Sequence, residues 1–396
     1  MTRIPDMHDA EPIPDAARAE VERLFASGDL FRYHTAEDNP VTLLEDEFAA
    51  FLGSRFALAV SSCSAALFLS LKALDLPRDA RVLLPGFTFA AVPSAVMHAD
   101  CIPVLCEVGA NYRIDLSDFE AKISGVDAVI ISHMRGHTSD MDAILRIADA
   151  HSVPVIEDAA HSLGTKWGGR NIGTLGAIGC FSFQSYKLVN AGEGGILVTD
   201  DPDLVARAVI MSGAYESNWK KHSVLHDAVA RWQNKLPLYN MRLSNLSAAI
   251  IRAQLPEIPR RVRDGRRNHD YVAGILRQSA WFHVPNALAP EERAPDSLQF
   301  NLCGMSDEDV TAFVAAAADM GVKVQVFGLS QNNARAFWNW EFLSERVELP
   351  KTRAMLMRAC DTRLPARLSL EECALVAQIL AEAADSVMGP ARTYGT

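Results

Sequence analysis

The stretch FSFQSYKLVNAGEGG (181–195) joins two apolar runs, GCFSF (179–183) and GGILVTD (194–200), which have the composition of buried β-strands. Between the runs lie a single lysine, Lys187, and a glycine-rich turn, GEGG (192–195). A surface lysine needs no strand before it and no flexible turn after it, but a lysine that forms a Schiff base needs such a fixed position. The stretch therefore predicts two strands of a sheet with a reactive amine between them.

Upstream of this stretch, short apolar runs alternate with helical patterns. The expected strands are RFALAV (55–60), RVLLP (81–85), IPVLCEV (102–108), VDAVIIS (126–132) and VPVIEDAA (153–160). The expected helices between them are SAALFLSLKAL (64–74), FAAVPSAVMHA (89–99) and MDAILRIADAH (141–151). Such alternation predicts an α/β fold with a mostly parallel, seven-stranded sheet sandwiched by helices. Active-site residues are then expected at the carboxyl ends of the strands.

The segment NPVTLLEDEFAAFLG (39–53) has the pattern of a complete helix. Thr42 and Glu45 have the spacing of a capping box, in which each side chain bonds the backbone N–H of the other residue. Gly53 follows the last apolar residue, at a position where helices commonly end. We therefore expect a helix that is capped at Thr42 and stops at Gly53.

From about Ser244 the pattern changes to longer helical stretches. The remainder has the pattern of a smaller α+β unit, with strands expected at 298–305 and 322–327 and helices at 307–321 and 368–387. The predicted division is a large domain at 1–250, including an N-terminal helical segment, and a small C-terminal α+β domain at 251–396.

Bulk composition excludes several classes of protein. The 396 residues carry a net charge of −11, which opposes binding to nucleic acid or to an anionic membrane. The seven cysteines form no CxxC pair, as is typical of a reducing compartment. The N-terminus has no apolar core of a signal peptide, and no apolar run reaches the length of a membrane span. We expect a cytoplasmic protein that acts on small molecules and holds no metal.

The strand VPVIEDAAH (153–161) ends in two acids, Glu157 and Asp158. A carboxylate at the buried end of a strand is costly unless a cation meets it. One explanation is a helix cap or a structural ion pair. The other is a partner for a protonated heterocycle, because an aspartate at the pyridinium nitrogen makes pyridoxal 5′-phosphate (PLP) an electron sink. One strand separates Asp158 from Lys187, so both side chains could reach one cofactor.

Two further segments could serve the same cofactor. The turn SSCSAALF (61–68) leads from a strand into a helix, and backbone N–H groups at a helix start can hold phosphate. Ser182 offers a hydroxyl from the strand before Lys187. Phe87 and Phe89 follow another strand, where an aromatic ring belongs to the core more often than it stacks on a planar ligand.

Taken in order, the serine-containing turn, the aromatic after a strand, EDAAH (157–161), FSFxxxK (181–187) and GEGG (192–195) form a motif set. The set resembles that of the DegT/StrS-type sugar aminotransferases, which are fold type I PLP enzymes of the aspartate aminotransferase superfamily. The likeness is close over residues 25–270. An ordered set of motifs is far more specific than any single one.

The resemblance implies a role for each matching residue around the cofactor ring. Lys187 matches the lysine that forms the Schiff base, and Asp158 matches the aspartate at the pyridine nitrogen. Phe89 matches the aromatic residue that stacks on the ring. His161 matches a position near the phenolic oxygen of the cofactor.

The resemblance also implies which residues hold the phosphate. Cys63 and Ser64 match a backbone pair at the helix start, where family members usually have glycine and threonine. Ser182 matches a phosphate-binding hydroxyl. Asn240 matches an asparagine that reaches the phosphate from the neighbouring subunit, which implies a homodimer with shared active sites.

The implied reaction is ping-pong transamination. L-Glutamate or L-glutamine leaves its amine on PLP, giving pyridoxamine 5′-phosphate. The amine then passes to a keto or aldehyde sugar, a sugar acid of the octulosonate kind, or a cyclitol. The segment 330–343 lacks the tyrosine- and proline-rich loop common among members that use nucleotide sugars, so a nucleotide-linked acceptor is less expected.

The acceptor site departs from the family pattern. HMRGH (133–137) replaces the usual LYGQ-like segment, so Arg135 and His137 could meet an anionic group of the substrate. Equally, Arg135 could pair with a neighbouring acid such as Asp140. Tyr215, in the loop 213–238, is expected to help shape the acceptor site.

Two alternatives stay open. A PLP-binding regulatory protein would keep the pocket but not turn over. A different PLP-dependent modification of a sugar would keep the cofactor, although relatives that dehydrate sugars have histidine where this chain has Lys187. A dinucleotide-binding protein is disfavoured, because no G-x-G-x-x-G follows the first strand.

Overall fold

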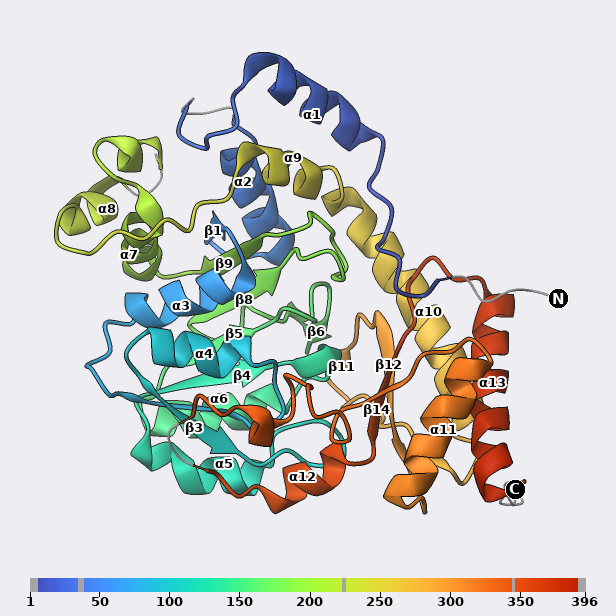
Figure 1. Cartoon of the computed structure of the whole chain (residues 1–396). Helices are drawn as coiled ribbons and strands as arrows, with labels where there is room; N and C mark the ends of the chain where they lie inside the picture. The colour runs from blue at the N-terminus through green and yellow to red at the C-terminus, as the bar shows by residue number, and fades with distance from the viewer. Residues whose placement is uncertain (1–5, 35–38, 223–225, 344–345, 391–396) are drawn as a thin grey trace.

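The seven apolar runs that were predicted as strands form one sheet in the computed structural model, which describes residues 6–34, 39–222, 226–343 and 346–390 (Figure 1). The strands are β1 (Phe56–Val60), β2 (Arg81–Pro85), β3 (Ile102–Cys106), β4 (Ala128–Ser132), β5 (Val155–Asp158), β8 (Ile178–Ser182) and β9 (Gly195–Thr199). Their order across the sheet is β1-β9-β8-β5-β4-β2-β3. Only β9 runs antiparallel to its neighbours; the other four pairings are parallel. The predicted α/β fold class is confirmed.

Alternation along the strands explains why helices cover both faces of the sheet, because successive side chains point to opposite faces. Leu58, Val60 and Ile130 belong to one apolar cluster, whereas Ala59 and Ile131 belong to the other. The first cluster includes residues of α3 (Cys63–Ala73), α4 (Ala91–His98) and α7 (Pro202–Gly213). The second includes residues of α2 (Pro40–Leu52), α5 (Leu116–Lys122), α6 (Met141–Ala150) and α9 (Asn245–Arg252).

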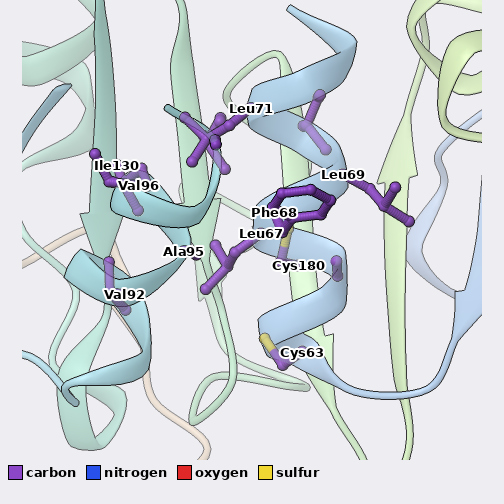
Figure 2. Packing of buried hydrophobic residues seen from close by; sticks show 14 of the residues in the cluster. Cys63, Leu67, Phe68, Leu69, Leu71, Val92, Ala95, Val96, Ile130 and Cys180 are labelled. Atoms are coloured by element: carbon purple, nitrogen blue, oxygen red, sulfur yellow. The ribbon is translucent and has the colours of Figure 1, made fainter. Parts of the chain in front are cut away.

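Helix α3 is deeply embedded in the first cluster, because nine of its eleven residues are buried. Figure 2 shows Leu67 on the side of this helix that faces α4, where Val92 and Ala95 lie. Its N-terminus therefore has a fixed position at the end of β1, where Ser62 caps the helix by accepting a hydrogen bond from the backbone N–H of Ala65.

Helix α2 differs from the prediction at its start. The cap is Asn39, whose Oδ1 accepts hydrogen bonds from the backbone N–H groups of Val41 and Thr42 at 3.1 and 3.0 Å. The predicted capping box is wrong because Glu45 is committed elsewhere: its carboxylate pairs with the buried Arg32. The predicted end is correct, since Gly53 stops the helix with a φ of +77°.

A long helix, α10 (Ile258–Leu276), leads from α9 to a second unit (Figure 1). That unit contains an antiparallel sheet in the order β10-β12-β14-β13, made of Phe282–His283, Ser297–Leu302, Ala359–Arg363 and Gln325–Val326. Helices α11 (Asp307–Asp319) and α13 (Leu370–Met388) share its apolar cluster with α10. Strand β14 was not predicted. The division after residue 250 stays a prediction; this residue lies within α9.

Short elements complete the described parts of the chain. They are α1 (Ala16–Ser27), α8 (His226–Trp232), α12 (Pro350–Leu356), β6 (Lys166–Trp167), β7 (Arg170–Asn171), β11 (Glu291–Glu292), and single turns at Ile123–Gly125, Met134–Gly136, Asn218–Lys221, Leu255–Glu257 and Phe337–Asn339. No helix among the described residues has both the length and the apolar composition needed to cross a bilayer.

Candidate active site

A cavity of about 1030 Å³ lies between the carboxyl ends of the parallel strands and the smaller sheet. From the large sheet, β5 and β8 contribute their last residues, and the segments that follow β1, β2 and β4 form further parts of the wall. From the smaller sheet, β13 and β14 contribute the opposite wall. The cavity therefore joins segments far apart in the sequence.

Eight of the eleven residues that the sequence proposed for the site line this cavity. They are Cys63, Ser64, Phe89, Arg135, Asp158, His161, Ser182 and Lys187. The described lining does not include His137, Tyr215 or Asn240. Phe89 is 45% exposed and presents its ring to the cavity, whereas Phe87 is buried in the core against Phe327.

Asp158 ends β5 and is 7% exposed. Its Oδ2 accepts a hydrogen bond from the hydroxyl of Ser132 at 2.7 Å, and that hydroxyl accepts one from Thr88 at 2.9 Å. Its Oδ1 accepts the backbone N–H of Ala160 at 3.2 Å. Within the described ranges, no basic side chain lies within ion-pair distance of this carboxylate. A buried carboxylate so held and without a counter-ion favours a cationic ligand.

Lys187 lies between β8 and β9, and its Nζ is 2.9 Å from Nε2 of His161. Burial, followed by the positive charge of Arg135, lowers the pKa of Lys187 to about 8. Burial, and then the charge of Lys187, also hold the pKa of His161 well below its usual value, so this imidazole is neutral near pH 7. The amine thus has a large unprotonated fraction at mildly alkaline pH, the form that can attack a carbonyl.

The start of α3 forms the other end of the cavity. Backbone N–H groups in the first turn of a helix have no acceptor within that helix. Gly195 of β9 approaches this turn so closely that a Cβ atom there would lie 2.4 Å from the backbone nitrogen of Cys63. Glycine thus allows the strand to pass beneath the turn. With Ser182 at the end of β8, these groups make a pocket that suits an anion.

Arg135 has an unusual backbone conformation and a partner that the sequence did not indicate. Its φ of +55° lies in the left-handed region. Its guanidinium pairs with Asp361 of β14 at 2.6 Å, and both side chains are buried. Asp140, the partner considered from the sequence, instead caps α6. Gln299 supports the pair by donating to the other oxygen of Asp361 at 2.7 Å.

His137 is buried beside the cavity rather than in its described lining. Its Nε2 is 3.0 Å from Oε1 of Gln299 and 3.3 Å from a guanidinium nitrogen of Arg293. Burial and the charge of Arg293 hold the pKa of His137 well below its usual value. The ring thus supports Gln299, which in turn supports Asp361. The expectation that His137 meets a substrate anion is not met by this arrangement.

Three residues of the site were missed in the sequence: Ser132, which bonds Asp158 from outside the described cavity lining, and two arginines of that lining. Ser132 ends a predicted strand at the expected edge of the sheet, so its position was available from the pattern. Arg335 and Arg363 were not, because Arg335 lies in an irregular segment and Arg363 ends the unpredicted strand β14. Both arginines line the cavity.

The sequence of the chain matches a known protein family and several individual proteins. Residues 16–381 match the model of the DegT/DnrJ/EryC1/StrS aminotransferase family. The spore coat polysaccharide biosynthesis protein SpsC of Bacillus subtilis is 35% identical over 254 residues, which cover 63% of this chain and 64% of that protein, so the match spans just under two thirds of that relative. The 3-amino-5-hydroxybenzoate synthase of Amycolatopsis mediterranei is 30% identical over 344 residues, 84% of each chain.

Among solved structures, that of a 3-amino-5-hydroxybenzoic acid synthase superposes with a TM-score of 0.85 at 26% sequence identity. The superposition covers 97% of this chain and all of the other. The two sheets and the helices that flank them are therefore shared over nearly the whole length.

Proposed function

Because the chain belongs to the DegT/DnrJ/EryC1/StrS aminotransferase family, whose members depend on PLP, we propose that it is a transaminase for sugar-like acceptors. It transfers the amino group of L-glutamate or L-glutamine to a keto or aldehyde sugar, a sugar acid or a cyclitol. The predicted family and enzyme class are confirmed by this membership. The observation that carries the proposal is that one cavity joins a buried carboxylate lacking a counter-ion to a lysine of lowered pKa.

The residues of the cavity fit PLP. Asp158 lacks a cation within the described ranges, and a protonated pyridine nitrogen would supply one. The start of α3, which Gly195 allows to lie close against β9, and the hydroxyl of Ser182 would hold the phosphate. The exposed face of Phe89 would cover the ring. When bound, PLP supplies an aldehyde that takes up the donor's amine as pyridoxamine 5′-phosphate and passes it to the acceptor.

The side chains of the chain itself manage charge and protons. Asp158, whose carboxylate accepts a hydrogen bond from Ser132, would keep the pyridine nitrogen of a bound cofactor protonated. Lys187 would accept a proton at Nζ from the substrate carbon that carries the amine and donate it to the cofactor carbon that takes up the amine. In the second half-reaction the same amine would move a proton in reverse, from that cofactor carbon to the acceptor carbon. His161 holds Nζ in place at 2.9 Å, and its lowered pKa makes it a weaker base than Lys187, so it does not compete for this proton.

The acceptor class is supported by the relatives. The protein aligned over 84% of its length is named for 3-amino-5-hydroxybenzoate, a ring compound that carries an amine. SpsC is named for polysaccharide biosynthesis. Both names are compatible with amine transfer to a sugar or a sugar-derived ring, and amino sugar biosynthesis in the cytoplasm is the setting that we propose.

We also propose a homodimer as the working unit. Asn240, matched to a phosphate ligand of the neighbouring subunit, lies outside the cavity lining described for its own chain. Its proposed role therefore needs a second copy, whose cavity it would reach.

The test is the absorption spectrum of the protein loaded with PLP. A visible band that disappears on addition of L-glutamate or L-glutamine is the expected result, and Lys187→Ala abolishes the response. A visible band that stays unchanged after addition of every amino donor would instead favour the regulatory alternative. Protein that takes up no PLP would refute the assignment of the cavity.

A further inference from the structure

The cavity contains three arginines beyond the residues proposed to hold the cofactor and to move the proton, and we infer that they form a subsite for a carboxylate group of the acceptor. Arg135, Arg335 and Arg363 are called here the arginine cluster. The inference rests on the proposed function and narrows its acceptor class to keto or aldehyde sugar acids, at the expense of neutral sugars, cyclitols and nucleotide-linked sugars.

The three arginines come from three separate segments of the chain, but their charges all affect the same side chain, that of His161. Arg135 follows β4, Arg335 lies between β13 and α12, and Arg363 ends β14, and all three line the same cavity. Their positive charges each lower the pKa of His161, the side chain that contacts Nζ of Lys187. The cluster therefore faces the reacting end of the cavity rather than a remote part of the surface.

The charges of the cluster are incompletely balanced. Arg135 pairs with Asp361 at 2.6 Å, and Arg363 with Asp296 at 3.3 Å. In the part of the chain that the structure describes, Arg335 has no acidic partner; its guanidinium lies 5.6 Å from the ring of Phe89 and 3.5 Å from Oε1 of Gln325. Burial lowers the pKa of Arg335 to about 10, which still leaves it charged at neutral pH.

Each arginine of the cluster also keeps an unused donor. The Nε atoms of Arg135, Arg335 and Arg363 are buried without a hydrogen-bond partner among the described residues. Arg135 and Arg363 are themselves only 8% and 9% exposed. A buried donor without an acceptor is costly, and planar guanidinium groups are matched by the two oxygens of a carboxylate. A carboxylate in the cavity would balance the excess charge of the cluster.

Ping-pong catalysis explains why the acceptor, and not only the donor, should carry the carboxylate. Donor and acceptor occupy the same cavity in turn, and an amino acid donor brings a carboxylate with it. A neutral acceptor would leave the partly buried Arg335 with no counter-ion among the described residues during the second half-reaction. A sugar acid keeps the subsite filled in both halves.

The fold holds the cluster in position at some cost. Arg135 has a left-handed backbone conformation, which persists only where the surroundings enforce it. Asp361 fixes its guanidinium, Gln299 fixes Asp361, and His137 contacts Gln299. His137 is thus a positioning residue for the subsite, two side chains removed from the cluster.

The first experiment uses the wild-type enzyme and acceptors that differ only at one carbon. The holoenzyme is first aminated with L-glutamate and freed of donor, and the return of the visible band is then followed. The matched pairs are 5-keto-D-gluconate with L-sorbose and D-glucuronate with D-glucose. We expect the acids to give at least about tenfold higher kcat/KM. Equal rates within both pairs, or a preference for a UDP-linked 4-keto sugar, would overturn the inference.

The second experiment measures binding rather than turnover. D-Gluconate, which has no reactive carbonyl, should bind the wild-type holoenzyme in calorimetry, and D-glucitol should not. Arg335→Gln should weaken gluconate binding about tenfold to a hundredfold. Arg335→Lys, which keeps the charge but not the planar fork, should fall between the two. The matched control is Arg358→Gln, since Arg358 pairs with Asp307 outside the described cavity lining.

The outcomes separate the two proposals. Loss of the visible band with L-glutamate but equal binding of gluconate and glucitol would leave the transaminase standing and refute the carboxylate subsite. No response to any amino donor would refute the transaminase itself. The wild-type comparison of the two acceptor pairs decides the matter even if Arg335→Gln fails to fold.

Discussion

At the residue scale, the hydroxyl of Ser132 controls the carboxylate that is central to the proposed site. It donates to Asp158 at 2.7 Å inside a buried environment, where a hydrogen bond to a charged group stabilises by roughly 1.5–3 kcal/mol. We predict that Ser132→Ala lowers the rate of the donor half-reaction about tenfold or more while PLP still binds. Stopped-flow absorbance with L-glutamate checks this.

The control for Ser132 is Ser94→Ala, because the hydroxyl of Ser94 donates to the backbone oxygen of Ala90 and Ser94 lies outside the described cavity lining. This variant should react at the wild-type rate. An unchanged rate in Ser132→Ala would show that the hydrogen bond from Ser132 to Asp158 does not affect the donor half-reaction.

The pKa of Lys187 gives a pH dependence with a definite direction. Burial first, and Arg135 second, lower this pKa from 10.5 to about 8, so the folded protein holds the neutral amine above pH 8. The unfolded chain still binds the proton up to about pH 10.5, so this group makes folding more favourable as the pH rises from 8 towards 10.5. The neutral amine is also the form that attacks an aldehyde.

We therefore predict that the apoprotein takes up PLP faster as the pH rises, with a midpoint near pH 8 and a plateau above it. The measurement is the rate at which the visible band appears after PLP is mixed with apoprotein at pH 6 to 10. A midpoint at the ordinary lysine value would mean that Nζ is hydrated and not buried.

Residues of the site differ in how far the sequence reveals them. Lys187 and Asp158 stand in apolar runs where a charged side chain is conspicuous, and they recur in a fixed order with other motifs. Arg335 has neither advantage, because it lies in an irregular polar segment and reaches the cavity only through the packing of Phe89 and Phe327. Long-range packing of this kind leaves no periodic pattern in a sequence.

At the element scale, β14 shows why the smaller sheet was only partly predictable. Its sequence, ACDTR, has two charged residues in five, yet every residue is buried. The charges are tolerated because Asp361 pairs with Arg135 and Arg363 pairs with Asp296. Hydrophobic alternation cannot reveal a strand whose polar side chains are neutralised by distant partners.

The start of α2 illustrates a different limit. The spacing of Thr42 and Glu45 matched a capping box, but Asn39 accepts the backbone N–H of Thr42 that Glu45 would have bonded, and Pro40 has a backbone angle suited to the first turn. Glu45 is drawn to Arg32, which is 13 residues away and has no other acid at ion-pair distance among the described residues. The spacing of Thr42 and Glu45 alone could not show whether the carboxylate of Glu45 bonds the backbone N–H of Thr42 or pairs with Arg32.

The ion pair of β14 leads to a prediction about stability. Removing one partner of a buried pair leaves the other charge without compensation, which costs about 3–5 kcal/mol. We predict that Asp361→Asn lowers the free energy of unfolding by about 3 kcal/mol, because Arg135 loses its acid at 2.6 Å. Urea denaturation of the apoprotein, followed by tryptophan fluorescence, measures the change.

The matched control for Asp361 is Asp307→Asn. Asp307 also pairs with an arginine at 2.6 Å, but its side chain is 53% exposed, and pairs at the surface contribute less than about 1 kcal/mol. If the two variants lost equal stability, burial would not be the reason for the effect at β14.

At the scale of the whole molecule, the large sheet could be derived from the sequence and the relation between the two units could not. All seven predicted strands are present, because parallel strands buried on both faces are continuous apolar runs. The approach of β13 and β14 to the carboxyl ends of β4 and β5 depends instead on the path of α10 and on single pairs such as Arg135–Asp361. The part of the cavity wall that β13 and β14 contribute therefore could not be predicted from the sequence.

The proposed sharing of sites between two chains can be tested by complementation. Asn240→Ala and Lys187→Ala homodimers are each expected to be impaired, by about tenfold or more for the loss of a phosphate contact and completely for the loss of the reactive amine. In a mixed dimer, however, a site that keeps Lys187 in one chain meets an intact Asn240 from the other. Because a twofold dimer has two equivalent sites, one of the two is then fully restored.

We predict that subunit exchange between the two variants restores about one quarter of the wild-type activity, since half of the dimers are mixed and each has one intact site. Differently tagged chains, refolded together and purified through both tags, should reach about one half. The control is the double variant mixed with wild type, which places both defects in one chain and leaves each mixed dimer with no site that has both residues intact. If Asn240 acted within its own chain, the two single variants would not complement, whereas the double variant with wild type would retain one intact site in each mixed dimer.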